Sequence, residues 1–189
     1  MSALTDALNY VLDRHTAINP DFASNLLPGL PREKIIEMMK PIVDRAPEEL
    51  IDLYEWHNGS SFYYCFLPCF EFKPLEHAIE MGINGYHRNN DNWLPIMDCN
   101  GDAQLIMMFG ENPDTIPIYC RDLECGIYEQ CFNSLTTMIQ TIAACFDENL
   151  YWCDEAQRRI QGRNYDRYCQ IHKQYNPNSD LLHKMFFED

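Results

Sequence analysis

Long apolar runs are missing from this sequence. No stretch approaches the roughly 18 consecutive apolar residues that a membrane-spanning helix needs. The first residues, MSALTDALNYVLDRH, contain no basic segment followed by an apolar one, the pattern of a secretory signal peptide. We therefore expect a protein without membrane spans that stays in the cytoplasm.

Enzyme motifs are missing as well: the sequence has no P-loop, no G-x-G-x-x-G and no H-E-x-x-H. Asp98 and Asp102 flank a turn without the alternating ligands and final Glu of an EF-hand, so we interpret that turn as solvated. His57 could act as the base for a cysteine nucleophile, but none of the cysteines lies in a sequence pattern typical of a nucleophile. We expect no catalytic residues and no cofactor.

Basic side chains are scarce: 14 lysines and arginines stand against 29 aspartates and glutamates, for a net charge of −15. Residues 1–154 carry 24 acidic and 8 basic side chains, whereas residues 155–189 carry 5 and 6. Such a surface repels nucleic acid, because nucleic-acid binding rests on cationic contacts to phosphate. The acidity either attracts a basic partner or only keeps the domain soluble.

The nine cysteines follow no zinc-binding pattern. Zinc sites favour closely spaced cysteine pairs completed by a second pair or by two histidines. Such further ligands are missing from the sequence near Cys65 and Cys69. They are also missing near Cys120, Cys125 and Cys131. In a reducing cytosol we expect mostly buried, free thiols. The prediction is therefore no bound metal and no disulfide.

Apolar residues at helical spacing predict three helices before residue 60. They are expected over 4–14, over 32–40, and from Pro47 to the Asn58–Gly59 pair, which supplies the left-handed residue that ends a helix.

Two helices are expected near the C-terminus. Ser134 should cap the first, over 135–146, and a long polar helix should follow over about 154–173. On that helix Arg159, Arg163 and Arg167 would line one face, with Arg158 beside them. We expect this cationic face to pack against the acidic part of the domain, residues 1–154, or to be exposed to solvent. The alternative is that it contacts phosphate or nucleic acid.

Between residues 60 and 132 the pattern is typical of strands. A Cys99–Asp102 turn containing Asn100-Gly101 indicates a hairpin, and PLEHAIEMG (74–82) a short helix. The predicted fold is α+β: one domain with a central antiparallel or mixed sheet of five or six strands, flanked by N-terminal and C-terminal helices. We divide the chain into a helical lead-in (1–46), a core (47–150) and a C-terminal helical extension (151–189) packed on the same domain.

Four segments, in order, resemble the SUKH superfamily of Smi/Knr-like domains. This superfamily contains bacterial toxin-immunity proteins and fungal regulators of cell-wall synthesis. PEELIDLYEWHNG (47–59) resembles its proline-led helix, FEFKPLEHAIE (70–80) its next strand and short helix, WLPIMDCNGDAQLIMMF (93–109) its tryptophan-proline hairpin, and SLTTMIQTIAACF (134–146) its closing helix. The resemblance covers over half of the chain.

This resemblance implies a sheet flanked by helices that binds other proteins, without cofactor or catalytic residues. Its motif residues are expected to be scaffold: Asn58, Gly59, Trp93, Pro95 and Gly101. The two glycines permit positive φ, and Trp93 has the size to anchor the sheet against a helix.

The leading functional hypothesis is an immunity-type protein that binds and neutralises a toxin, such as a nuclease, through an acidic surface. Such a surface would mimic the charge of the nuclease's substrate and speed association. The candidate contacts border strands or loops of the motif region: Glu71, Glu76, Asp91, Asp98 and Asp102. The alternative is an intracellular regulatory or scaffold protein with a resident partner and no toxin. A hydrolase is a third class.

Overall fold

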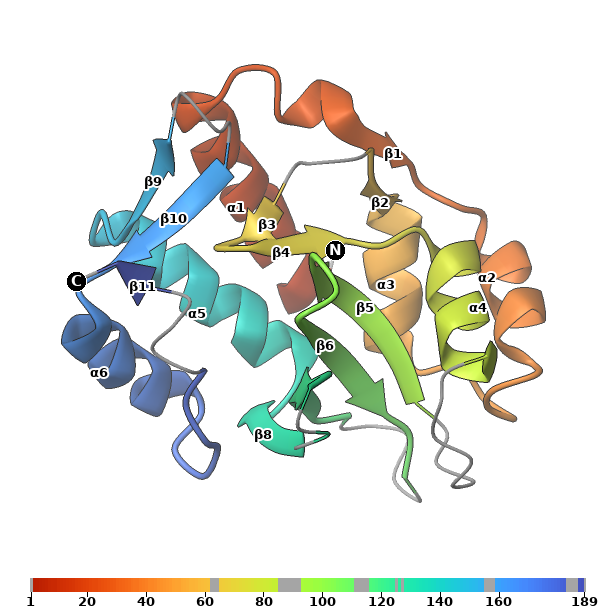
Figure 1. Ribbon diagram of the computed structural model, residues 1–189. Helices are drawn as coiled ribbons and strands as arrows, with labels where there is room; N and C mark the ends of the chain where they lie inside the picture. Colours follow the sequence, from red (N-terminus) through yellow and green to blue (C-terminus); the bar gives the residue numbers. More distant parts are fainter. Residues whose placement is uncertain are drawn as a thin grey trace.

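The strands predicted between residues 60 and 132 form one six-stranded sheet, in the order β3-β4-β5-β6-β7-β8 (Figure 1). The computed structural model that gives this fold describes residues 2–61, 65–84, 93–110, 116–124, 126, 128–154, 159–182 and 187–188, and only the backbone of 84, 153, 154, 159 and 188. The strands are β3 (Cys65–Leu67), β4 (Phe70–Phe72), β5 (Trp93–Cys99), β6 (Ala103–Met108), β7 (Ile118–Asp122) and β8 (Tyr128–Phe132). All neighbouring pairs are antiparallel.

The central hairpin, β5–β6, is the one that Asn100-Gly101 predicts. Both residues have positive φ, 49° and 86°, and Asp102 N donates to Cys99 O at 2.8 Å. Positive φ at both central positions is what a type I′ turn requires. Pro95 lies further along β5, where the register with β6 shifts, and a bulge is one of the few places where a strand accepts proline.

The Asn58–Gly59 pair does not end a helix, so that prediction is wrong. Helix α3 (Glu48–Trp56) stops earlier, and the pair lies in β2 (His57–Ser60). Gly59 has a φ of +82°, and a Cβ there would lie 2.4 Å from Pro74 N, a separation that only glycine permits. Asn58 Oδ1 accepts a hydrogen bond from Leu75 N at 2.8 Å. The pair therefore anchors β2 to the first turn of α4 (Leu75–Asn84).

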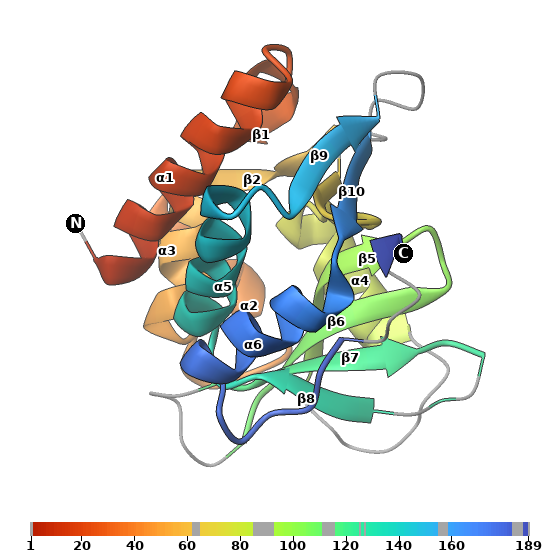
Figure 2. The ribbon, with the colours of Figure 1, turned by 90° about the vertical axis from the view of Figure 1, so that its left-hand side faces the viewer.

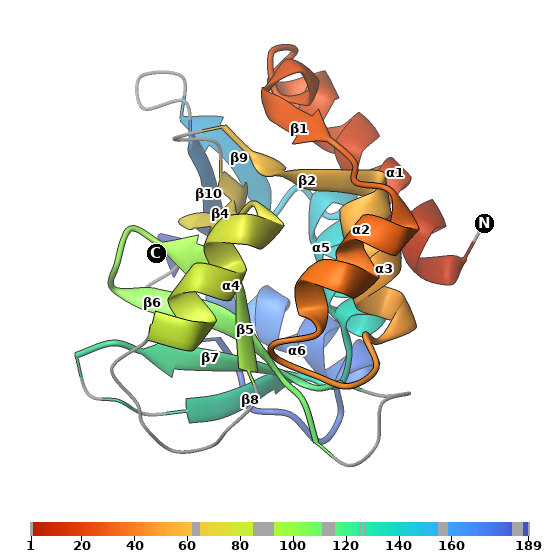
Figure 3. The same cartoon turned by 90° about the vertical axis from the view of Figure 1, so that its right-hand side faces the viewer.

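Helix α4 runs two residues past Gly82, which was predicted to end it. A Cβ at Gly82 would lie 2.9 Å from Trp93 O, so this glycine serves close packing of α4 along β5 (Figure 3). Trp93 is only 5% exposed, which confirms the prediction that it is buried.

Three helices lie side by side against the sheet: α1 (Ala3–Ile18), α3 and α5 (Leu135–Asp147) (Figure 2). Ser134 caps α5 as predicted, because its hydroxyl accepts from Thr137 N at 3.2 Å. The carboxylate of Glu49 in α3 accepts from Leu135 N at 3.2 Å and Thr136 N at 3.1 Å, which favours the positive end of α5. One hydrophobic core joins these helices to the sheet, and the fold is a single α+β domain.

The remaining N-terminal elements cover the side of α3. The chain passes from α1 through a 3-10 turn (Ala23–Asn25) into β1 (Leu26–Pro28), which pairs with β2. Helix α2 (Arg32–Met39) then packs against both α3 and α4.

The C-terminal segment differs most from the prediction. Two strands lie where the start of a helix was expected, β9 (Tyr151–Asp154) and β10 (Arg159–Arg163), and α6 begins only at Tyr165 and ends at Tyr175. Strand β10 also pairs with β11 (Phe187–Glu188), giving a three-stranded sheet beside β3. Arg159 and Arg163 thus lie on a strand, and the predicted cationic helix face does not form. Arg158 lies outside the described residues.

Candidate functional site

Two of the predicted contact residues, Glu71 and Asp98, lie opposite each other on β4 and β5. Directly opposed residues of antiparallel strands share one face of a sheet. Lys73 lies between them, with Nζ 3.0 Å from Glu71 Oε2 and 3.5 Å from Asp98 Oδ2. The side chains of Glu71, Lys73 and Asp98 are only 17, 13 and 11% exposed. The prediction that Asp98 is a solvated turn carboxylate is therefore wrong.

The same row continues across the sheet, because Asp98 opposes Gln104 and Gln104 opposes Arg121. Gln104 Nε2 donates to Asp98 Oδ1 at 3.3 Å, and its Oε1 accepts from Arg121 Nη1 at 3.3 Å. The Arg121 guanidinium stands over the rings of Trp93 and Tyr128, at 5.0 and 5.7 Å from their centroids. Arg121 is buried, and its Nε has no hydrogen-bond partner in the structure.

We call Glu71, Lys73, Asp98, Gln104 and Arg121 the polar row. Its two carboxylates and two cations balance in charge, and Gln104 links the two halves. Charged groups with this little exposure have largely lost their hydration, so the ion pairs mainly offset the cost of burying them. The polar row therefore holds four strands in register and offers no excess negative charge to a basic partner.

The other three predicted contacts do not lie in this row. Glu76 Oε2 accepts from Asn58 Nδ2 at 3.1 Å, and its Oε1 lies 3.6 Å from Lys34 Nζ. Burial disfavours the ionised form of Glu76, yet these two contacts leave its pKa below the ordinary value. Asp102 is exposed at the hairpin turn, and Asp91 lies outside the described residues.

Exposed carboxylates gather instead on α2 and α4, which lie side by side (Figure 3). Two large apolar side chains are exposed there, Ile36 at 40% and Ile83 at 57%. We define the acidic helical face as the exposed acidic and apolar residues of these helices: Glu33, Ile36, Glu37, Glu76, Glu80 and Ile83. Lys34 and His77 are exposed on the same helices, and Lys34 is paired with Glu76. Within the described part of the chain, Glu33, Glu37 and Glu80 form no ion pair. This face combines apolar contact area with unneutralised negative charge.

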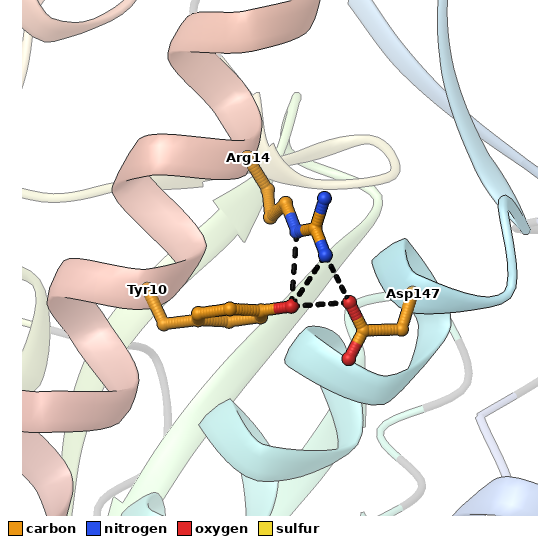
Figure 4. A network of polar contacts seen from close by, with 3 residues as sticks. All are labelled: Tyr10, Arg14 and Asp147. Atoms are coloured by element: carbon orange, nitrogen blue, oxygen red, sulfur yellow. Dashed lines mark hydrogen bonds and ion pairs between the residues drawn. The ribbon is translucent and has the colours of Figure 1, made fainter.

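Several basic side chains elsewhere are paired with the chain's own carboxylates. Figure 4 shows Arg14 of α1, whose Nη2 lies 2.5 Å from Asp147 Oδ1 of α5, with the Tyr10 hydroxyl donating to the same oxygen. Arg32 Nη2 contacts Glu48 Oε2 at 2.6 Å, and Arg167 is paired with Glu148, whose pKa the hydrogen bond from Arg167 lowers. These contacts are exposed and contribute little stability.

The histidines and thiols of the described residues serve packing and backbone contacts. His57 Nδ1 donates to Leu27 O at 2.9 Å, which joins β2 to β1. The part of the chain that the structure describes contains no group of three or more His, Cys, Asp or Glu side chains able to hold a metal ion. Cys125 falls outside it. Burial raises the pKa of the Cys145 thiol to about 12, so that thiol stays protonated and poorly nucleophilic at neutral pH.

Comparisons with known proteins leave the family open. No family model matches the chain, and no curated protein matches it. The resemblance to SUKH proteins thus rests on the four segments of the sequence that carry it. None of the described helices has the length and apolar character needed to cross a bilayer.

Proposed function

We propose that the protein is a cytoplasmic, non-catalytic, SUKH-type domain that binds and neutralises a basic toxin, with the acidic helical face as its contact surface. The observation that carries the proposal is the position of Ile36 and Ile83 among exposed carboxylates. Exposed apolar residues bordered by charge are typical of protein-binding surfaces. The carboxylates would steer a cationic partner toward the surface, and the isoleucines would supply contacts that persist after docking.

The order of elements also supports the SUKH assignment. The four segments that carry the resemblance become α3 with β2, β4 with α4, the β5–β6 hairpin, and α5. Trp93, Pro95, Gly59 and Asn58 all occupy packing or turn positions, which is the scaffold role that the resemblance implies.

The partner is to be captured from the native cell on the immobilised chain, identified by mass spectrometry and then titrated as a purified protein. Reversing three unpaired charges together, with Glu33→Lys, Glu37→Lys and Glu80→Lys, should slow association about tenfold or more at low salt. Added salt should slow association of the unmodified chain in the same way. The matched control is Asp6→Lys with Asp13→Lys, which reverses two exposed carboxylates of α1 and should leave the rate nearly unchanged.

Four outcomes separate the alternatives. If co-expression of the chain relieves the toxicity of the captured protein, the immunity role is supported. A non-toxic resident partner would instead favour the regulatory or scaffold function. If binding tolerates the triple reversal but is lost in Asp102→Lys, the contact surface includes the hairpin turn and not the acidic helical face. Binding that does not depend on salt would refute the electrostatic argument.

A further inference from the structure

Two pairs of cysteine thiols join neighbouring strands of the six-stranded sheet. Cys69, in the turn before β4, is hydrogen-bonded through its thiol to Cys99 at the end of β5. Cys120 of β7 is hydrogen-bonded in the same way to Cys131 of β8. In each pair one thiol is buried, Cys99 or Cys131, and the other is partly exposed, Cys69 or Cys120. None of these four described cysteines is part of a disulfide in the structure.

Unusual backbone geometry brings both pairs together. Cys69 has a φ of 68°, in the left-handed region, which non-glycine residues seldom occupy. Cys131 lies at a bulge: Ile118 opposes Phe132 and Tyr119 opposes Gln130, which leaves Cys131 without an opposite residue on β7. An extra residue at a bulge re-aims its side chain. Here the Cys131 thiol donates to Glu129 O at 3.4 Å and also contacts the Cys120 thiol.

We propose that Cys69–Cys99 and Cys120–Cys131 are oxidation-sensitive dithiol sites, each of which closes to a disulfide by exchange with a small disulfide such as oxidised glutathione. The inference is independent of the partner-binding proposal, since it needs neither a partner nor the acidic helical face.

The reaction follows from the difference in exposure within each pair. The partly exposed thiol, Cys69 or Cys120, loses its proton to solvent and attacks one sulfur of oxidised glutathione, which forms a mixed disulfide and expels one glutathione thiolate. The buried thiol then loses its proton, attacks the protein sulfur of the mixed disulfide and expels the second glutathione. The protein dithiol is oxidised by two electrons, and one glutathione disulfide is reduced to two thiols.

The protonation of the buried thiols agrees with this division of roles. The hydrogen bond between Cys99 and Cys69, and then burial, raise the pKa of Cys99 above its usual range. The same two causes raise the pKa of Cys131. Because Cys99 and Cys131 are buried away from the oxidant, each acts in the second step, where its thiolate is the attacking species. That step should be slow near neutral pH and accelerate as pH rises.

Two further cysteines serve as internal controls. The thiol of Cys145 is hydrogen-bonded to Tyr151, and that of Cys169 to Tyr165. Neither contact can close to a disulfide. Cys169 is partly exposed, as are Cys69 and Cys120, which makes it the matched control for accessibility alone. Cys65 lies near Cys99 as well, so the experiment must identify the bonded pair.

The full chain is to be incubated with oxidised glutathione, alkylated, digested without reduction and mapped by mass spectrometry. We expect two cross-linked peptide pairs, Cys69 with Cys99 and Cys120 with Cys131. Cys120→Ser should abolish the second cross-link and retain the first, and Cys69→Ser should do the reverse. Cys169→Ser should retain both. Circular dichroism and thermal melting check the fold of each variant, and Cys120→Ala and Cys69→Ala replace any serine variant that does not fold.

Several results would overturn the proposal. A chain that remains fully alkylatable would show that the thiols are only packing groups. Glutathione adducts without cross-links would show that the thiols react singly and do not act as dithiol sites. Cross-links between Cys65 and Cys99, or with Cys125 or Cys153, would show that another pair reacts first. A yield of cross-link that is unchanged in Cys120→Ser and Cys69→Ser would equally exclude these two pairs.

Discussion

His15 should make the stability of the protein strongly dependent on pH under mildly acidic conditions. Its imidazole is 0% exposed, and its Nε2 donates to Phe66 O at 2.8 Å. The rings of Phe22 and Phe146 lie 4.0 and 4.8 Å away, between ring centroids. Nδ1 has no hydrogen-bond partner among the residues that the structure describes. Protonation there would place a charge and an unsatisfied N–H among aromatic rings, and burial therefore lowers the pKa of His15 to about 3.

The direction and size of the effect follow from proton binding. Below the ordinary histidine value of about 6.5, the unfolded chain binds a proton that the folded protein does not. The free energy of unfolding therefore falls as pH falls, by about 1.4 kcal/mol per pH unit. Between about pH 6.5 and pH 5 the loss is about 2 kcal/mol. It continues until the folded protein protonates, near the pKa of about 3, when the total reaches about 5 kcal/mol.

Urea unfolding at about pH 7 and about pH 5 measures this difference. His15→Phe preserves the aromatic packing but cannot titrate, so the difference between the two pH values should shrink by about 2 kcal/mol. Its absolute stability will also fall, because the Phe66 carbonyl loses its donor. His77→Gln on α4, where His77 is exposed, is the control and should leave the difference unchanged. A His15→Phe variant with the full pH dependence would refute the reasoning.

Three further predictions concern stability. Asp98→Lys should lower the free energy of unfolding by about 3–5 kcal/mol because it breaks a buried ion pair. Asp102→Lys should change it by less than about 0.5 kcal/mol. Equal unfolding midpoints of the two variants in urea would contradict the conclusion that the polar row stabilises the sheet. Trp93→Ala should cost about 3–5 kcal/mol, and a thermal melt close to that of the unmodified chain would show that the sheet does not depend on this side chain. Gly59→Ala should destabilise the protein more than Gly101→Ala. In both variants alanine must adopt a positive φ, which costs about 1–2 kcal/mol, but only the Cβ at Gly59 would clash with backbone atoms, those of Pro74 and its neighbour. If denaturant titrations give similar losses of unfolding free energy for the two variants, the backbone around Gly59 can shift to accept a Cβ.

The features that the sequence predicts well depend on local backbone chemistry. Ser134 caps α5 because its own hydroxyl reaches Thr137 N, and Asn100 and Gly101 form their turn because both tolerate positive φ. Such preferences act within a few residues and need no knowledge of the rest of the fold.

The helix predicted from about 154 to 173 fails because its first half is a strand for tertiary reasons. Strand β10 pairs with β9 on one side and β11 on the other, and strand preference depends strongly on such neighbours. A local signal was present, however. Gly162 and Asn164 interrupt the apolar spacing, and Asn164, with its side chain accepting from Arg167 N at 3.2 Å, caps α6.

The polar row could not be predicted because it depends on strand register. Gln104 and Arg121 stand out as polar residues within otherwise apolar strand segments, which was a signal that they have buried partners. Their meeting with Asp98 requires the register of β5–β6 and β6–β7 together, and a shift of one residue would turn each to the other face. Candidate contacts chosen only for lying near strands or loops therefore included Glu71 and Asp98, which the fold neutralises.

Two imidazoles occupy the outer edges of the six-stranded sheet. His15 of α1 donates to Phe66 O on β3, and His172 of α6 donates to Cys131 O on β8, where Asp180 N also donates to Gln130 O at 2.7 Å. Edge strands with occupied backbone groups are poor templates for strands of another molecule, which opposes aggregation and makes strand addition an unfavourable way for a partner to bind. Burial lowers the pKa of His172 too, so acid favours states in which both imidazoles have left their buried sites and are protonated. Self-association in acid should accordingly begin at these edges, after α1 and α6 detach and before the β5–β6 hairpin opens.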